Sequence, residues 1–345
     1  MIGRVVILDE VNGRHAAALI VDGQLEDIAV DPLDDTPMPG AIYRAVADRP
    51  MKGQGGIFVK LPHGSGFLRQ ISGITPGQRI LVQVTGPTEP GKATPVSARL
   101  LFKSRFAILT PDAPGLNISR RIKDEDLRAA LSELAKDGMK GAAQGLGLIL
   151  RSGCADAEGD AIAEDLAAMR GLAEAVLADF AGAPELLVEG PGAHDLAFRD
   201  WLDPAVDDMV TDAGGFETHG VHEMIAALMT ARVDLPGGGH MMVEPTRALV
   251  AVDVNTGPDT TPAAALKVNI AAARDLPRQL RLRGLGGQVV ADFAPMPKRD
   301  RHILDQVMKA AFKGDAEANL AGWTTLGLYE MTRKRDRLPL ADLLT

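Results

Sequence analysis

The pattern of apolar and polar residues predicts a β-meander at the start of the chain. Apolar residues occur there in short runs or at alternate positions, which is typical of strands. The dipeptides Asn12-Gly13 and Asp22-Gly23 join these runs and favour two-residue hairpin turns, because their residues tolerate a positive φ. The strands are expected at residues 3–10, 14–21 and 24–30.

Short strands separated by glycine-containing turns follow and predict a small barrel. Their number and spacing suit an OB-type barrel of about five strands. Phe58 and Phe67 lie on these strands. Their rings either stack on nucleic-acid bases or pack in the barrel core, and core packing is the more common role. The clearest strands are expected at residues 41–48, 55–62, 65–71 and 79–86.

In the middle of the chain, apolar residues recur at the spacing typical of amphipathic helices. Residues 124–137 carry an apolar stripe at helical spacing, and residues 145–153 then form an apolar run that predicts a buried strand. Segments rich in Ala and Leu predict three further helices. These are expected at residues 157–182, 193–202 and 219–231.

A strand–helix–strand pattern occupies the last third of the chain. Thr261 as N-cap and Pro262 at the first helical position begin a helix that runs to about Arg283. Pro277 is expected to kink or split this helix. Such a crossover places its two strands parallel in one sheet. A hairpin before the helix and the returning strand after it are expected at residues 241–255 and 286–293.

Acidic and amide side chains stand where these two strands end. Asp253 and Asn255 are two residues apart and leave the same face of their strand, and Asp292 ends the other. If the strands are neighbours, the two carboxylates converge and require a proton or a cation between them. An all-oxygen site suits Mg²⁺ or Mn²⁺. The alternative is that each Asp caps a turn, and for the matched pair the two readings are equally weighted.

The composition is that of an ordinary globular protein with room for two or three domains. The chain has 345 residues, of which 46% are hydrophobic and 24% charged. Its one cysteine, Cys154, excludes an internal disulfide and a Cys-based zinc site, and is expected to be a packing residue. The start "MIGRVVILDE" lacks the features of a signal peptide. No apolar run reaches the roughly 18–20 residues of a membrane span, so a cytoplasmic location is expected.

The net charge of −9 is unevenly distributed. Residues 155–217 carry sixteen acids and two arginines, whereas residues 278–338 carry twelve Lys or Arg and seven acids. A basic face on an acidic protein suits a polyanion such as RNA. The alternative is that these runs are solvated helix faces, and this interpretation is favoured when the runs are considered alone. His219 and His222 have the spacing of a metal pair, but without a third ligand they are expected to be surface or core residues.

Several segments resemble the bacterial RNase E/RNase G family of endoribonucleases. The core motifs are "AVDVNTG" and "QLRLRGLGGQVVADF", and four further segments follow the family order. The resemblance implies a mixed α/β (α+β multidomain) fold. Its parts are an RNase H-like domain at residues 1–37 and 186–228, an inserted OB-fold RNA-binding barrel at 38–97, a 5′-sensor region at 98–185 and a deoxyribonuclease-I-like catalytic domain at 229–345. The four further segments are "NISRRI", "GLGLILRSG", "AFRDWL" and "LYEMTRKRDR".

The resemblance also implies a role for individual residues. Asp253 and Asp292 match the family's magnesium ligands, and Asn255 matches a polar residue that orients the site. The implied reaction is hydrolysis of single-stranded, AU-rich RNA to a 5′-phosphate and a 3′-hydroxyl. The implied 5′-phosphate site comprises Arg151, Ser152 and the backbone of Ile108. The implied RNA contacts of the barrel are Phe58, Phe67 and Lys92.

Departures from the family pattern shape the remaining expectations. The family continues into a zinc-binding CxxC linker and a small dimerisation domain, whereas this chain ends at "LPLADLLT". We therefore expect a short form with no zinc that is a monomer or a weak homodimer. Ala271 and Ala294-Pro295 stand where the family has other residues, acidic ones included, and Asn319 replaces an arginine used beside the 5′-phosphate. The leading hypothesis is a Mg²⁺-dependent endoribonuclease, and the alternative is an RNA-binding protein of the same fold with weakened catalysis.

Overall fold

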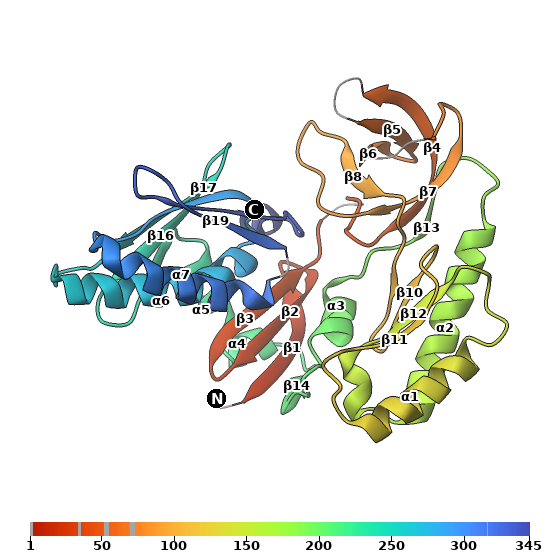
Figure 1. The fold of residues 1–345 in the computed structure, drawn as a ribbon, viewed down its shortest axis with the longest axis horizontal. Helices are drawn as coiled ribbons and strands as arrows, with labels where there is room; N and C mark the ends of the chain where they lie inside the picture. Colours follow the sequence, from red (N-terminus) through yellow and green to blue (C-terminus); the bar gives the residue numbers. More distant parts are fainter. Residues whose placement is uncertain (1–2, 34–35, 52–54, 70–72, 316) are drawn as a thin grey trace. The chain divides into compact units, whose positions relative to one another are not determined.

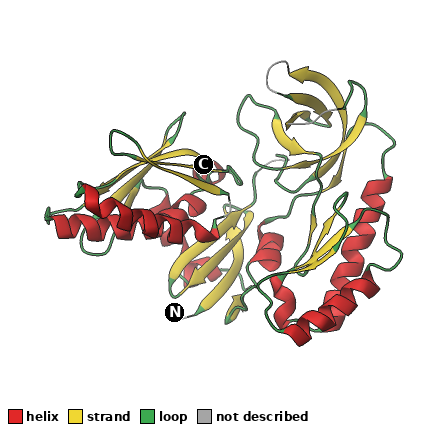
Figure 2. Ribbon diagram, in the orientation of Figure 1, coloured by secondary structure: helices red, strands yellow, loops and turns green. Residues whose placement is uncertain are grey.

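The fold is described from a computed structural model, which covers residues 3–33, 36–51, 55–69, 73–315 and 317–345. Helices and strands are interspersed along the chain, so the mixed α/β class expected from the sequence is confirmed (Figures 1 and 2). The chain divides into two compact units. Unit 1 comprises Ile7–Val30 and Val210–Thr345, and unit 2 comprises Gly3–Val6 and Asp31–Met209.

The predicted meander is present as three antiparallel strands. These are β1 (Arg4–Val11), β2 (Arg14–Val21) and β3 (Gln24–Val30), and the short strand β14 (Asp208–Val210) lies beside β1 in the order β14-β1-β2-β3. Asn12 and Asp22 both have positive φ, as do the glycines that follow them. Both hairpin turns therefore have the left-handed residues that Asn-Gly and Asp-Gly favour.

An OB-like barrel forms from five strands of unit 2. The sheet order β13-β4-β5-β6-β8-β7 is closed by an additional pairing of β4 with β7, which leaves β13 on the outer edge of β4. Ala45, Val59 and Val82 fill the barrel core and are fully buried. The strands are β4 (Ile42–Met51), β5 (Gly56–Leu61), β6 (Gly64–Arg69), β7 (Arg79–Val84), β8 (Thr94–Ser97) and β13 (Glu185–Val188).

A second sheet of unit 2 packs against two helices. Its order is β11-β12-β10-β9, and its apolar side chains form one core with those of α1 and α2. The N-cap Asp124 accepts a hydrogen bond of 2.8 Å from the backbone N–H of Leu127, which begins α1 where the sequence predicts it. The elements are β9 (Phe102–Lys103), β10 (Ala107–Thr110), β11 (Leu116–Ile118), β12 (Gly147–Leu150), α1 (Glu125–Gly138), α2 (Gly159–Ala178) and α3 (Ala193–Asp200).

Unit 1 contains a six-stranded sheet with helices on one face. The strand order is β15-β16-β17-β18-β20-β19, and α6 and α7 share one hydrophobic core with the buried side chains of the sheet (Figure 1). The strands are β15 (Arg232–Asp234), β16 (His240–Pro245), β17 (Val250–Asn255), β18 (Gly287–Asp292), β19 (Ala318–Trp323) and β20 (Tyr329–Arg333). The helices of this unit are α4 (Gly215–Thr218), α5 (Val221–Leu228), α6 (Pro262–Leu282), α7 (Arg301–Ala311) and α8 (Leu340–Leu344).

The predicted helix across Thr261–Arg283 is confirmed at both ends, but its predicted division is wrong. Thr261 is the N-cap and Arg283 the C-cap of α6, which is assigned as one helix through Pro277. A proline inside a helix costs about 3 kcal/mol or more through a lost hydrogen bond and a clash. Leu276 and Leu280 flank it and are almost completely buried, and their burial contributes about 1.5–3 kcal/mol each. Packing therefore offsets the cost of the proline.

Two other predicted elements are shorter than expected. The helix predicted at residues 219–231 is observed as α5, Val221–Leu228, which begins only after Gly220 because that residue has a φ of 66° and cannot be part of a right-handed helix. The strand predicted at residues 145–153 ends at Leu150, and Ser152 then begins a short 3₁₀ turn. Within the described ranges, no helix combines the length and apolar character needed to span a membrane.

Candidate active site

Two carboxylates lie side by side on neighbouring parallel strands of unit 1. Strand β17 pairs with β18 in parallel, and the register places Asp253 directly opposite Asp292. Neighbouring strands are separated by about 4.8 Å, so the two side chains leave the sheet next to each other. The convergence expected from the strand–helix–strand pattern is therefore present. Both aspartates are exposed to solvent.

The alternation of residues along the two strands decides which face carries these acids. Val252 and Val254 of β17 are buried against the helices, as are Val289 and Ala291 of β18. Asp253 and Asp292 are out of phase with them and leave the opposite face, which the exposed pattern of both strands also indicates. The hydrophobic core thus fixes the direction of the acidic side chains.

Asn255 is tied to the first of these acids. Its Nδ2 donates a hydrogen bond of 2.6 Å to Oδ2 of Asp253. Because the two residues are two apart on one strand, this bond lies on the open face of the sheet. The bond restrains the rotamer of Asp253. It leaves the Oδ1 atom of Asp253 and the side-chain Oδ1 atom of Asn255 for a ligand.

The donor set fits a small hard cation that keeps most of its water. Across the described ranges, no group of three or more His, Cys, Asp or Glu side chains is arranged to hold a metal. Mg²⁺ is commonly held by one or two carboxylates and several waters, which matches Asp253 and Asp292 with the amide oxygen of Asn255. The same result leaves His219 and His222 without a third ligand among those residues, and His222 packs edge-on against Phe216 at 5.9 Å between ring centroids.

Two residues on the open face were not found from the sequence. His240 of β16 lies opposite Asn255, and Glu330 of β20 lies opposite Val290, two residues from Asp292. Residues directly opposite in antiparallel strands share a face. Alternation in "HMMVEP" and "YEMTR" indicates which residues point outward, but only the strand register places them beside the acid pair.

A third residue missed from the sequence, Asn269 of α6, holds the segment that follows Asp292. Asn269 is completely buried. Its Oδ1 accepts a 2.9 Å hydrogen bond from the N–H of Ala294, and its Nδ2 donates a 2.9 Å bond to the carbonyl of the same residue. Ala294 is itself buried, and Ala271 of α6 packs partly buried against the same core. The two alanines that depart from the family pattern are therefore packing residues.

The implied 5′-phosphate residue Arg151 lies in unit 2 and is already bonded. Its Nη1 donates to the carbonyls of Ser104 and Arg199, at 2.5 and 2.9 Å. Its Nη2 donates to Oδ1 of Asp200 at 2.7 Å. Lys103 and Arg199 also contact the Asp200 carboxylate, at 2.7 and 2.8 Å. Arg151 is thus one of three cations around a single acid.

The cations around Asp200 lower the pKa of its carboxyl group. Burial acts to raise the pKa of Asp200, but the hydrogen bond and charge of Arg199, together with Lys103, outweigh burial and lower the pKa to about 2. Burial also lowers the pKa of Lys103, against the effect of Asp200. The carboxylate of Asp200 is therefore ionised at every physiological pH.

Ser152 and Ile108 complete the set implied for a 5′-phosphate. The hydroxyl of Ser152 donates a short hydrogen bond to Oδ2 of Asp203, and Arg121 contacts both groups at 3.2 and 3.4 Å. Ile108 lies in β10 between β9 and β12, opposite Lys103. Arg151, Ser152 and Ile108 thus belong to the same small sheet and its edge.

Cys154 follows this cluster and is a packing residue, as expected. It is completely buried in the core shared by the sheet and α1–α2. Burial raises the pKa of its thiol to about 11, and the Sγ lies 3.4 Å from the carbonyl oxygen of Phe106. The sulfur is therefore protonated and unreactive in the folded chain.

The two barrel phenylalanines form a pair outside the barrel core. Phe58 and Phe67 are directly opposite on β5 and β6, with ring centroids 5.2 Å apart. Both are half-buried, whereas the alternate residues Ile57 and Val59 fill the core. The core-packing alternative is therefore wrong for these rings. The guanidinium of Arg49 lies 5.3 Å from the Phe58 centroid.

Lys92, the third barrel residue implied to contact RNA, lies in a loop before β8. Its Nζ lies 2.5 Å from Oε2 of Glu89, and its side chain is about two-thirds exposed. Exposed ion pairs of this kind contribute little to stability, so Lys92 can exchange this partner for another anion at small cost.

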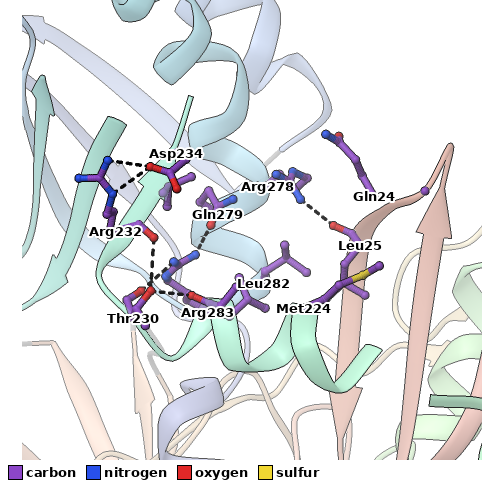
Figure 3. Close-up of a pocket in the computed structure, with 14 residues that line it drawn as sticks. Gln24, Leu25, Met224, Thr230, Arg232, Asp234, Arg278, Gln279, Leu282 and Arg283 are labelled. Carbon is purple, nitrogen blue, oxygen red and sulfur yellow. Dashed lines mark hydrogen bonds and ion pairs between the residues drawn. The ribbon is translucent and has the colours of Figure 1, made fainter. Parts of the chain in front are cut away.

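Unit 1 also has a pocket of about 470 Å³ between α5, α6, β15 and the β2–β3 turn (Figure 3). Three arginines line it, and each is already bonded. Arg278 donates to Asp275 and to the carbonyl of Leu25, Arg232 pairs with Asp234, and Arg283 donates to Gln279 and to the carbonyl of Thr230. Burial lowers the pKa of Arg283 to about 10. These contacts give the arginines structural roles.

An OB-like barrel combined with paired carboxylates at strand ends is an arrangement suited to proteins that bind and process nucleic acids. The family model described as the ribonuclease E/G family matches residues 102–215 and 214–336. The chain belongs to this family, and the resemblance inferred from its motifs is confirmed.

Curated relatives have the same family names. The chain is 30% identical over 387 residues to ribonuclease E of Nostoc sp., covering 96% of this chain and 56% of that protein. It is 30% identical over 325 residues to ribonuclease E of Synechocystis sp., covering 83% and 48%. Ribonuclease G of Salmonella typhimurium is 28% identical over 309 residues, covering 78% and 62%. The chain thus spans about half of the length of these relatives.

Proposed function

We propose that the chain is a metal-dependent endoribonuclease that cleaves single-stranded, AU-rich RNA by hydrolysis of phosphodiester bonds. The products would be a 5′-phosphate and a 3′-hydroxyl. The observation that carries the proposal is the register of Asp253 against Asp292, in a chain of the ribonuclease E/G family. Carboxylates placed together at the carboxyl ends of parallel strands are a frequent location for catalytic groups.

The metal would be held by Asp253 and Asp292. Mg²⁺ fits this oxygen donor set, with Mn²⁺ as its alternative. Bound there, the cation would supply an activated water and neutralise charge on the phosphoryl oxygens. Asn255 contributes by fixing the Asp253 rotamer through the 2.6 Å hydrogen bond, and Asn269 contributes by fixing the backbone that follows Asp292.

RNA would be bound on the barrel as well as at the acid pair. Phe58 and Phe67 present two adjacent ring faces outside the barrel core, and base–aromatic stacking contributes about 1–3 kcal/mol per base. Arg49 beside Phe58 and the exposed Lys92 would bind phosphates of the same strand. The barrel would therefore bind an RNA strand by stacking bases on its aromatic rings and by pairing phosphates with its cationic side chains.

We assign the remaining parts by the family plan. The RNase H-like domain would combine residues 1–37 and 186–228, which agrees with β14 lying beside β1. The barrel would occupy 38–97, the sensor region 98–185 and the deoxyribonuclease-I-like domain 229–345. Arg151, Ser152 and Ile108 would bind the 5′-phosphate, which would exchange with Asp200 and Asp203 as a partner of Arg151 and Ser152.

The test is cleavage of a short AU-rich RNA with a 3′ fluorophore in the presence of Mg²⁺ or Mn²⁺. Asp253→Asn and Asp292→Asn should each abolish cleavage while RNA binding in a shift assay persists. Asp212→Asn removes the same charge from an exposed loop of unit 1 and should cleave like wild type. Cleavage by both site variants at the wild-type rate would exclude the acid pair as the active site.

A second candidate is an RNA-binding protein of the same fold with weakened catalysis. It is favoured by the small acidic set at the site, where Asp253 and Asp292 have no third acidic, His or Cys partner placed for a metal among the described residues. RNA that is bound but returned intact with either metal would support this candidate. Wild-type cleavage that depends on both aspartates would exclude it.

A further inference from the structure

Arg301, the first residue of α7, has a guanidinium that is stacked but not neutralised. Its Cζ lies 4.5 Å from the centroid of the Trp323 ring, so the cation lies over an aromatic face. Its Nε is shielded from water and has no hydrogen-bond partner among the described residues. Two nearby acids have other partners. Asp300 lies 3.8 Å from Nε of Arg299, and Asp305 accepts a 2.9 Å hydrogen bond from Nε1 of Trp323.

The surroundings of Arg301 hold its guanidinium in one place. Trp323 is itself fixed by its hydrogen bond to Asp305 and packs edge-on against Tyr329, with ring centroids 5.3 Å apart. A Cβ at Gly327 would lie 3.0 Å from Nη2 of Arg301, so the turn between β19 and β20 approaches the cation closely because it has no side chain there. An arginine ordered in advance loses less entropy when it binds a ligand.

The guanidinium of Arg301 lies near the edge of the sheet that carries the acid pair. Gly327 precedes Tyr329 by two residues, and Tyr329 lies opposite Ala291, the residue before Asp292. From the spacing of strands and of residues along them, Gly327 is on the order of 10 Å from Asp292. Neighbouring phosphates of an extended single strand are separated by a distance of this order. A strand with one phosphate at the acid pair therefore has another within reach of Arg301.

The charge of this segment suits an RNA backbone. Two exposed carboxylates repel a polyanion, and cations beside them reduce this repulsion. Lys298 and Arg299 are both exposed next to Arg301. A guanidinium also binds phosphate oxygens through paired N–H donors, which an ammonium cannot do. Because Arg301 has no carboxylate partner among the described residues, a phosphate would not have to displace one.

We propose that Arg301 binds a backbone phosphate of the RNA, one or two nucleotides from the bond that is cleaved. The contact holds the strand across the edge of the sheet, so that the phosphate to be cleaved lies at Asp253 and Asp292. This inference rests on the proposed endoribonuclease function and adds a substrate-binding residue to the same site.

The first test measures the salt dependence of RNA binding. A short AU-rich RNA with a 3′ fluorophore is titrated by anisotropy at several salt concentrations, in the Asp253→Asn background so that the RNA stays intact. Each phosphate contact to a single strand contributes about 0.7 to the slope of log affinity against log salt. Arg301→Gln should therefore lower the slope by about 0.7 and weaken binding by about tenfold at low salt. Arg301→Lys keeps the charge and should keep most of the slope.

The second test locates the phosphate. In a series of RNAs, one linkage at a time is replaced by a neutral methylphosphonate. In the Asp253→Asn protein, one linkage should stand out with a loss of affinity of about tenfold. With Arg301→Gln added, the same substitution should cost less than about twofold, because the cation that it pairs with is already absent.

Two controls separate this contact from general effects of charge and folding. Lys309→Gln removes one exposed cation from the last turn of the same helix, about 12 Å along its axis, and should leave the slope and the methylphosphonate pattern unchanged. Thermal unfolding checks that each variant is folded. Should Arg301→Gln not fold, Arg301→Met keeps an unbranched stem against Trp323 and gives the same comparison.

The outcomes distinguish this inference from the proposed function. A wild-type chain that cleaves no RNA counts against the endoribonuclease, whereas the binding measurements need no cleavage and still test Arg301. A folded Arg301 variant with an unchanged salt slope would overturn the inference, and would leave the arginine as a structural partner of Trp323. Equal methylphosphonate effects with and without Arg301 at every linkage would also overturn it.

Discussion

Replacement of Asn269 by leucine tests how the fold holds the active-site backbone. Asn269 is completely buried on α6, and its side-chain amide makes two 2.9 Å hydrogen bonds with the backbone of Ala294. Leucine has the same number of side-chain heavy atoms with the same branching, but it neither donates nor accepts. The substitution therefore leaves a buried N–H and a buried carbonyl without partners, two residues after Asp292.

The magnitude follows from these two bonds. Each buried polar group left unsatisfied costs about 1–3 kcal/mol, so the pair costs about 2–6 kcal/mol. The added apolar surface of leucine offsets part of this cost. We expect the free energy of unfolding to fall by about 2–4 kcal/mol. Asn269→Asp retains an acceptor for the Ala294 N–H and should lose less than the leucine variant if its carboxyl group is protonated.

The assay is urea unfolding followed by intrinsic fluorescence. Trp323 packs against Phe293, at 5.9 Å between ring centroids, and so reports on the segment between Asp292 and Ala294. Asn319→Leu is the matched control, because Asn319 is exposed on β19 and its replacement should change stability by less than about 0.5 kcal/mol. An Asn269→Leu variant as stable as this control would refute the reasoning. If it folds, it should also cleave RNA more slowly than wild type.

Three further predictions follow from the ionisable and aromatic groups. The folded pKa of Asp200 is about 2, below its unfolded value of about 3.9, so the stabilisation by Asp200 is present above the unfolded pKa and is lost as the pH falls from about 4 to 2. In acid-unfolding curves, Asp200→Asn should therefore flatten the fall in stability over this pH range. Cys154, with a thiol pKa of about 11, should resist iodoacetamide at pH 8 in the folded chain and react in urea, and rapid labelling without urea would contradict its burial. Phe58→Ala should weaken single-stranded RNA binding by about 5–100-fold, whereas Phe67→Tyr, which keeps the ring, should bind nearly like wild type in anisotropy titrations.

The sequence determined the local elements and the chemistry of the site. Asn12-Gly13 specified a hairpin because both residues accept a positive φ, and Thr261 with Pro262 specified the start of α6 through capping and a fixed φ. The strand–helix–strand pattern required parallel neighbours, which brought Asp253 and Asp292 to one edge. Each of these predictions depends on residues close in the chain, so local rules suffice.

Only the tertiary structure decided which distant side chains meet. Strand β20 lies beside β18 and places Glu330 on the face of the acid pair, but no local rule gives that register. Burial of Leu276 and Leu280 carries α6 through Pro277 against its local preference. The family resemblance implies that Arg151 contacts a phosphate, but only the structure shows that Asp200, 49 residues later, accepts a hydrogen bond from it. Hydrogen bonds and ion pairs act over a few ångströms of space whatever the separation along the chain, so only the folded arrangement shows which donors remain free.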